Sequence, residues 1–343
     1  MSQSVATSPT LAERLATIFQ RGDTKDLIAN AAVDVDQITI DGQVFPITTS
    51  DADQSGLGNP LQQLVAQTLT EPADLHLADR LRQGLGKGRG PLLKAAKLDK
   101  HVQFNNWLFP DNPAPALQGD QVTAMRDALI AAHPTRTIMI RSLTTGIDDA
   151  LMAALSAAGF ALLPTKPIWV TPVPSQRRAP VIAGHDLVDA HTFSANDFSR
   201  AAMLQAMADA QIPDTPAPRY TPGFLAQAHQ IDLLKIKGVR DGAENLIGVV
   251  GVFEAAGVIS APIMGYDPDF AGAAPLRGAL EQLVFAQASA EAAHYKTSRW
   301  RGPNASPAMS QTAVYVQHLG WQARAALKAL KPILQGMPPA ADD

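Results

Sequence analysis

The chain has 343 residues, of which 46% are apolar and 17% charged, and its formal net charge at pH 7 is −4. This length and apolar content predict one large globular domain or two ordinary ones and exclude wholesale disorder, while the charge indicates no global affinity for nucleic acid or an anionic membrane. Because the sequence contains no cysteine, a disulfide framework, a thiol nucleophile and a thiolate site for zinc or iron–sulfur clusters are excluded.

Residues 1–22 are expected to form an N-terminal helix. Thr10 and Glu13 have the spacing of a capping box. The apolar residues recur at helical spacing, at Leu11, Leu15, Ile18 and Phe19. A secretory signal is not recognisable, and no apolar run approaches the ~20 residues of a membrane-spanning helix. We therefore expect a cytoplasmic protein with this helix docked on its body; the alternative is a membrane-surface anchor.

Residues 23–178 are expected to form an N-terminal lobe. Its clearest local signals are a hairpin over 37–48 that turns at Asp41–Gly42 and a helix that begins at Asn59–Pro60. The pattern then predicts strands at 102–109 and 137–143, helices at 120–132 and 148–158, and two short strands between 160 and 173.

Residues 179–335 are expected to form a C-terminal lobe, because the proline-rich, aperiodic segment 171–184 is typical of a boundary. The pattern there predicts helices at 196–210, 222–230, 275–293 and 321–334, and strands at 231–239, 246–254, 258–266 and 312–319. A disordered tail is expected at 336–343. Both halves combine consecutive antiparallel strands with helices. This pattern predicts an α/β (α+β) protein of two lobes, each a mixed, largely antiparallel sheet flanked by helices.

A glycine-rich basic segment at 80–101 is the strongest electrostatic anomaly of the sequence. Backbone N–H groups of such a loop can hold a phosphate, with Lys87 and Arg89 adding positive charge. The segment matches neither a Walker A loop nor the dinucleotide-binding fingerprint. The alternative is a solvated basic loop without a ligand.

The sequence carries no recognisable pattern for metal or nucleophilic hydrolase chemistry. Its eight histidines include no HExxH and no histidine–carboxylate cluster with ligand spacing, so no metal site is expected. His185 and His191, near the lobe boundary, are interpreted as surface residues. No GxSxG nucleophile elbow occurs either.

Four short motifs occur in order over roughly residues 100–325. They are Asn-Asn-Trp-Leu at Asn105–Leu108, Arg-Ser-Leu at Arg141–Leu143, a Pro-x-x-Gly-Tyr-Asp corner at Pro262–Asp267, and Ala-Val-Tyr-x-x-His-Leu at Ala313–Leu319. With the two antiparallel strands before the corner and the helix after it, this order resembles the GNAT acyltransferase fold. The similarity is to the FemAB-like branch with two such domains, and most of all to a bacterial GNAT-like group of uncharacterised substrate.

The chain departs from that pattern in two places. The pyrophosphate-binding motif of GNAT enzymes is absent between residues 267 and 278, where only Gly272 and a helix start remain. Of a Ser-Gly-Ala…Phe-Lys…Arg-Gly stretch found in the group, only Arg301–Gly302 is kept. Binding of acyl-CoA, the co-substrate that the resemblance implies, thus rests on analogy of fold. No permanently bound cofactor is expected.

The resemblance implies direct transfer of an acyl or aminoacyl group from a thioester or ester to an amine or hydroxyl acceptor in the cleft between the lobes. The catalytic candidates are Tyr266, Asp267, Tyr315 and His318. The donor-binding candidates are Lys87, Arg89, Gly272 and Arg301. Candidates for substrate binding, or for holding the lobes together, are Asn105, Asn106 and Arg141.

Each candidate has a structural alternative. The aromatic and histidine side chains are alternatively strand-end packing residues, and Asp267 is alternatively the cap of its turn. Gly265, in the same corner, is expected to allow a backbone arrangement that a Cβ would hinder. Two further functions stay open. One is an aminoacyl-tRNA-dependent transferase, which the basic segment favours and the acidic balance of the remaining chain disfavours. The other is a non-catalytic binding or scaffold protein that keeps the fold.

Overall fold

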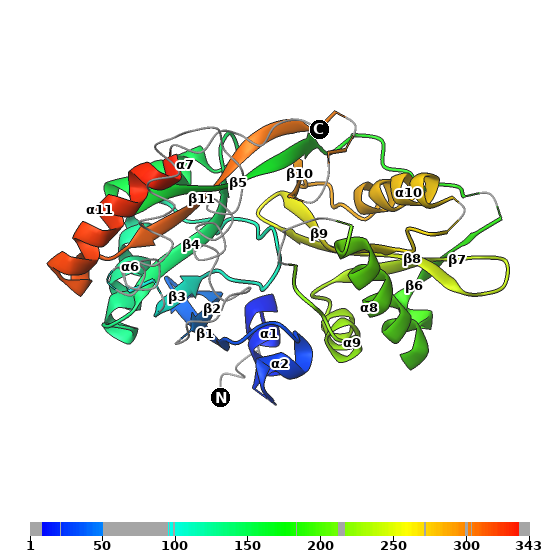
Figure 1. Cartoon of the computed structure of the whole chain (residues 1–343), viewed down its shortest axis with the longest axis horizontal. Helices are drawn as coiled ribbons and strands as arrows, with labels where there is room; N and C mark the ends of the chain where they lie inside the picture. The colour runs from blue at the N-terminus through cyan, green and yellow to red at the C-terminus, as the bar shows by residue number, and fades with distance from the viewer. Residues whose placement is uncertain are drawn as a thin grey trace, which may run out of the picture.

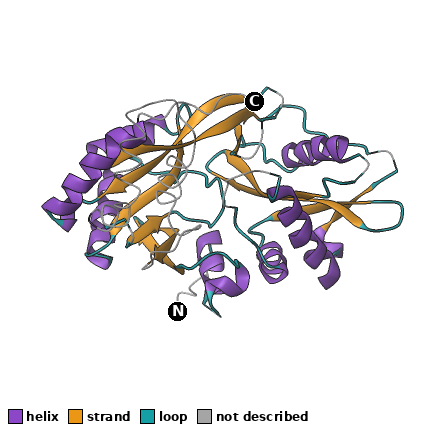
Figure 2. Ribbon diagram, viewed as in Figure 1, coloured by secondary structure: helices purple, strands orange, loops and turns teal. Residues whose placement is uncertain are grey.

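The computed structural model describes residues 9–20, 22–50, 95, 97–98, 100–182, 184–211, 217–270, 272–298, 301–302 and 304–335. In these residues eleven strands form one sheet, ordered β1-β2-β3-β4-β11-β5-β10-β9-β8-β7-β6 (Figures 1 and 2). The first six in this order are β1 (Asp34–Ile40), β2 (Gln43–Ser50), β3 (His101–Phe104), β4 (Thr137–Thr144), β11 (Ser306–Tyr315) and β5 (Ala161–Pro172). The other five are β10 (His294–Thr297), β9 (Val258–Tyr266), β8 (Leu246–Ala255), β7 (Lys235–Arg240) and β6 (Asp186–Asp189).

Helices cover both faces of this sheet. In the half that holds β1–β4, the covering helices are α6 (Gly119–Ala132) and α7 (Asp149–Ala157) on one face and α11 (Trp321–Gln335) on the other. In the half that holds β6–β9, they are α8 (Ala195–Asp209) and α9 (Pro222–Gln230) on one face and α10 (Ala273–Ala286) on the other. Helix α1 (Leu11–Phe19) packs against β1 and β2 and shares an apolar core with α8 and α9. A short helix α2 (Thr24–Leu27) and two 3-10 turns, η1 (Ala190–Thr192) and η2 (Gln317–Leu319), complete the described helices.

The predicted mixed, largely antiparallel sheet flanked by helices is confirmed, since only β3–β4 and β9–β10 pair in parallel among the described strands. The hairpin at Asp41–Gly42 is confirmed too: Ile40 pairs with Gln43, and both turn residues have the positive φ that such a turn needs. The capping box of α1 forms as expected, with Thr10 accepting the N–H of Glu13. The expected helix at Asn59–Pro60 and the basic segment 80–94 lie outside the described residues.

The two halves share one sheet instead of having a sheet each. β11, which comes late in the chain, lies between β4 and β5 and pairs with both, so the first half is completed by a strand from the predicted C-terminal lobe. The predicted boundary between residues 178 and 179 stays a prediction. No helix in the described part of the chain combines the length and the apolar character needed to cross a membrane.

A loop at 105–113 joins the two halves on the face covered by α8 and α9. The expected strand 102–109 ends at Phe104, because Asn105 has a φ of +54° and turns the chain out of the sheet. Trp107 and Phe109 then pack on Phe253 of β8, with ring centroids 4.9 and 5.0 Å apart. These aromatic residues of the first half therefore belong to the apolar core of the second half.

Candidate functional site

The parallel pair β9–β10 separates soon after it begins. Val258 and Ile259 pair with His294 and Tyr295, after which no further β9–β10 pair forms. β9 nevertheless continues to Tyr266 and stays paired with β8 on its other side. In the described sheet, residues 260–266 of β9 thus have one edge that no strand covers, and α10 begins shortly after this edge ends.

The N–H of Met264 marks this open edge. It donates to Oε1 of Gln205 on α8, 2.7 Å away, and not to β8. Because N–H groups of a strand alternate between its two sides, Met264 directs its N–H away from β8. Gln205 is buried, with 3% of its surface exposed, and its Nε2 donates to Oδ2 of Asp209 at 2.7 Å. The side-chain carbonyl of Gln205 therefore accepts a hydrogen bond that the N–H of Met264 could instead donate to a ligand carbonyl.

Gly265 lets α8 approach β9 this closely. A Cβ at Gly265 would lie 2.4 Å from the backbone nitrogen of Gln205, a separation that no real Cβ contact tolerates. The expectation that a Cβ would hinder this corner is thus explained by helix packing, with no need for an unusual φ.

Tyr266 and Asp267 follow at the end of β9. Tyr266 packs against the apolar cluster under α10. Oδ2 of Asp267 lies 3.4 Å from Nη2 of Arg200, and its Oδ1 accepts the N–H of Asp269 at 3.0 Å. The second contact is the turn cap anticipated as the structural alternative, while the catalytic role of Asp267 stays a prediction.

Two of the candidates for binding the acyl donor, Gly272 and Arg301, lie near α10. Gly272 is the N-cap of α10 with a φ of +132°, and no side chain caps the first turn there. The guanidinium of Arg301 lies over the ring of Trp169, 5.1 Å from its centroid. Lys87 and Arg89 lie outside the described residues.

Asn105, Asn106 and Arg141 meet in one buried network that holds the loop 105–113. Oδ1 of Asn106 accepts from Nη2 of Arg141 at 3.1 Å and from Nε at 3.3 Å. The remaining guanidinium contacts are the carbonyls of Phe109 and Pro110. Asn105 donates to the carbonyl of Pro113 at 2.9 Å. These residues therefore fix the loop whose aromatic side chains pack on β8; their role in substrate binding or in holding the lobes together stays a prediction.

Burial also changes the electrostatics of this network. It lowers the pKa of Arg141 to about 10, although the carboxylate of Asp111 acts in the opposite direction. Asp111 itself accepts from Ser298, just after β10, through the backbone N–H at 2.9 Å and the hydroxyl at 3.0 Å. The loop thus reaches from the Arg-Ser-Leu strand to the end of β10.

A buried cation, Lys296, lies on β10 at the same place. Its Nζ donates to the carbonyl of Ser142 on β4 at 2.8 Å, and 1% of its surface is exposed. β11 and β5 lie between these two strands, so a flat sheet would separate them by about 14 Å. The sheet must therefore bend around this point. Burial also raises the pKa of Asp148, and Lys296 opposes that rise.

Glu281 is a second carboxyl with a raised pKa, on the face covered by α10. Burial raises it, and the guanidinium of Arg277, 3.8 Å away, opposes the rise. A Cβ on Gly302 would lie 3.7 Å from Oε2 of Glu281, so this carboxyl lies beside the Arg-Gly segment. Groups with such shifts are candidates for proton transfer.

The structure does not bring Tyr315 and His318 to this place. The ring of Tyr315 packs on Phe160 and stacks on His318, and Nε2 of His318 contacts the carbonyl of Arg136 at 3.0 Å. On β5, the partner of Val314 is eight positions from the partner of Thr297, about 26 Å along the strand. The catalytic roles of Tyr315 and His318 stay predictions, and their observed contacts are those of strand-end packing.

Sequence reasoning missed the residues that meet only through the fold: Gln205, Asp111, Asp148, Glu281, Lys296 and Ser298. Lys296 and Ser142 are 154 positions apart, and Ser298 and Asp111 are 187 apart. A lysine inside the strand His294–Thr297 was the one signal available, since a buried cation needs partners.

No family model matches the chain, and no curated protein sequence matches it. Solved structures do. The tandem GNAT protein from the clavulanic acid biosynthesis pathway is 12% identical with a TM-score of 0.38, and the match covers 90% of each chain. A GCN5-related N-acetyltransferase from Kribbella flavida is 12% identical with a TM-score of 0.35, over 90% of this chain and 96% of that one. L-PGS from Bacillus licheniformis is 8% identical with a TM-score of 0.40, and the match covers 62% of this chain and 77% of that one. The solved structures similar to this chain thus include GNAT proteins.

Proposed function

We propose that the protein transfers an acyl group from a thioester donor such as acyl-CoA to an amine or hydroxyl acceptor at the open edge of β9. The observation that carries this proposal is the early separation of β9 and β10. An exposed strand edge can pair with an extended ligand that contains amide groups, as an added strand would. The pantetheine arm of coenzyme A is such a ligand, because it is extended and has two amides.

The edge also supplies a hydrogen-bond donor for the charge that develops during acyl transfer. When the acceptor nitrogen or oxygen attacks the thioester carbonyl carbon, negative charge develops on the carbonyl oxygen until the carbon–sulfur bond breaks. The N–H of Met264 is a suitable donor for that oxygen once the carbonyl of Gln205 gives way. The acceptor loses a proton to a base, and the departing thiolate gains one.

The other site candidates are assigned to the phosphates of the donor or to the acceptor. The first turn of α10, which begins after Gly272, offers N–H groups to the donor's phosphates. Arg301 is a further candidate for these phosphates, as are Lys87 and Arg89. We assign Tyr266 and Asp267, at the end of the open edge, to the acceptor. The network of Asn105, Asn106 and Arg141 fixes the loop that carries Asp111 to the end of β10.

The test is binding of coenzyme A, acetyl-CoA and longer acyl-CoAs to the full chain, measured by calorimetry and by thermal shift. A donor that binds only the folded state raises its melting temperature. Thiol release with a panel of amines then reports turnover. Absence of binding by every acyl-CoA would contradict the proposal and favour the non-catalytic alternative.

A matched pair of variants locates the phosphates. Ala274 is exposed in the first turn of α10. Ala274→Asp adds negative charge at a helix N-terminus, so the fold should be as stable as before or slightly more stable, while donor affinity falls at least tenfold. Ala274→Asn, which is neutral and of similar size, should keep donor affinity within about threefold. Equal affinities of the two variants would place the phosphates elsewhere.

A further inference from the structure

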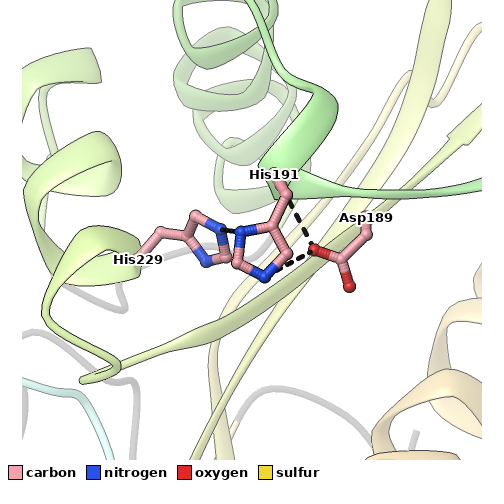
Figure 3. Close-up of side chains that lie close together, drawn as sticks. All are labelled: Asp189, His191 and His229. Atoms are coloured by element: carbon pink, nitrogen blue, oxygen red, sulfur yellow. Dashed lines mark hydrogen bonds and ion pairs between the residues drawn. The ribbon is translucent and has the colours of Figure 1, made fainter.

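Two histidines and an aspartate meet at the end of β6, on the side of the molecule where α9 lies (Figure 3). Asp189 is the last residue of β6, His191 lies in η1 just after it, and His229 is in the last turn of α9. Nε2 of His229 is 3.2 Å from Nδ1 of His191, and Nε2 of His191 is 3.7 Å from Oδ1 of Asp189. One ligand atom from each of the three residues can be chosen so that all lie within 4.8 Å of one another.

The 3.2 Å separation of the two histidine nitrogens fits a metal ion. The 3.7 Å contact of Asp189 is to the other nitrogen of the His191 ring, which cannot bind the same ion. Zinc binds imidazole nitrogen at about 2.0–2.1 Å with tetrahedral geometry, which puts two such nitrogens about 3.3 Å apart. The two histidine nitrogens are already at this separation, and a rotation of the aspartate side chain would bring its oxygen closer. Imidazole favours Zn²⁺, Ni²⁺ or Cu²⁺, whereas Mg²⁺ and Ca²⁺ prefer oxygen ligands.

The surroundings hold the carboxylate and leave the site accessible. Oδ1 of Asp189 accepts the backbone N–H of His191 at 3.2 Å, and its Oδ2 lies 3.8 Å from Nζ of Lys237. The backbone contact orients the carboxylate, whereas the ammonium competes with a metal ion for it. The three residues also line a surface hollow together with Asp232, Lys235 and Lys237. The side chain of His191 is 77% exposed, so an ion can enter and water can complete its coordination.

We propose that Asp189, His191 and His229 bind one divalent transition-metal ion, with Zn²⁺ as the reference ion, in this hollow. The site would tie the end of β6 to α9 through three side chains. A search for ligand spacing in the sequence does not find it, because His191 and His229 are 38 positions apart and meet only in the fold. The open, water-completed coordination predicts exchangeable binding and not a closed structural site.

The experiment titrates Zn²⁺ into untagged, metal-free full-length protein by calorimetry, with Mg²⁺ as the comparison ion. We expect one saturable Zn²⁺ site and no Mg²⁺ binding in the same range. His191→Ala and Asp189→Asn should each weaken Zn²⁺ binding at least tenfold, with unchanged melting temperature of the metal-free protein. The matched control is His185→Ala, which removes a histidine six positions earlier and should keep wild-type affinity.

Lys237→Met should change the Zn²⁺ affinity in the opposite direction to His191→Ala and Asp189→Asn. Removing an ammonium that competes for Asp189 should tighten Zn²⁺ binding several-fold. The proposal is overturned if the wild type has no saturable Zn²⁺ site, or if His191→Ala and Asp189→Asn both bind Zn²⁺ as the wild type does.

Discussion

The ammonium group of Lys296 on β10 donates a 2.8 Å hydrogen bond to the backbone carbonyl of Ser142 on β4, across two intervening strands. Ser142 has a φ of +63°, so the strand is irregular where it accepts this bond. A buried ammonium is costly unless it is paired, and here it also faces the carboxyl of Asp148. This contact therefore joins β10 to β4 at the bend of the shared sheet.

Lys296→Met should destabilise the protein by about 2–4 kcal/mol, because it leaves the carbonyl of Ser142 and the carboxyl of Asp148 without their cation. Urea unfolding measures the change. Lys235→Met is the control, since its side chain is 56% exposed and its ion pair with Glu254 is 4.0 Å long; that change should stay within about 0.5 kcal/mol. Equal stability of Lys296→Met and the wild type would show that the ammonium does not stabilise the bend.

Gly265→Ala should destabilise the fold by about 3 kcal/mol or more, because the new Cβ meets the backbone of α8 and the helix has to move. Gly278→Ala on α10 is a matched control with open space at the Cβ position. It should stabilise by up to about 1 kcal/mol through helix propensity. Thermal unfolding of the two variants compares them directly, and similar melting temperatures would contradict the close packing of α8 on β9.

Asp267→Asn separates the catalytic role from the turn role. Asparagine keeps an oxygen for the N–H of Asp269 but loses the charge that faces Arg200. Because this ion pair is partly exposed, the stability loss should be at most about 1 kcal/mol. If Asp267 orients an amine acceptor, turnover should fall strongly with folding intact. Turnover within about threefold of wild type would instead assign the residue to the turn alone.

Stability should fall as the pH drops below about 6.5. Burial lowers the pKa of His318, with the carbonyl of Arg136 opposing, and burial also lowers the pKa of His133. The folded protein then binds fewer protons at these rings than the unfolded chain does, so acid favours unfolding. The double variant His133→Gln/His318→Gln should show a flatter dependence between pH 7.5 and 5.5 in urea unfolding. An unchanged slope in the double variant would contradict the assignment.

The sequence predicts this fold best where neighbours in the chain decide the structure. The turn at Asp41–Gly42, the capping box of α1 and the strand pair β8–β9 depend on residues a few positions apart, and all form as expected. Strand order is different, because nothing local in Ser306–Tyr315 says that it inserts between β4 and β5. Among the site residues, the polar groups on apolar strands were recognisable because they need partners. Their partners were not, since Asp111, Gln205 and Ser142 come from elements far along the chain.

The position of β11 between β4 and β5 has a consequence for synthesis on the ribosome. When β5 has been made, β4 has one unpaired edge and β5 has two, because both neighbours of β5 come later in the chain. The strand that fills the gap between β4 and β5 follows only after about 130 more residues. At ribosomal rates of about 5–20 residues per second, this interval lasts roughly 7–25 s. Unpaired strand edges are a template for aggregation. We therefore expect the nascent first half to be prone to aggregation until β11 emerges, and a truncated gene ending before Ser306 should give insoluble protein.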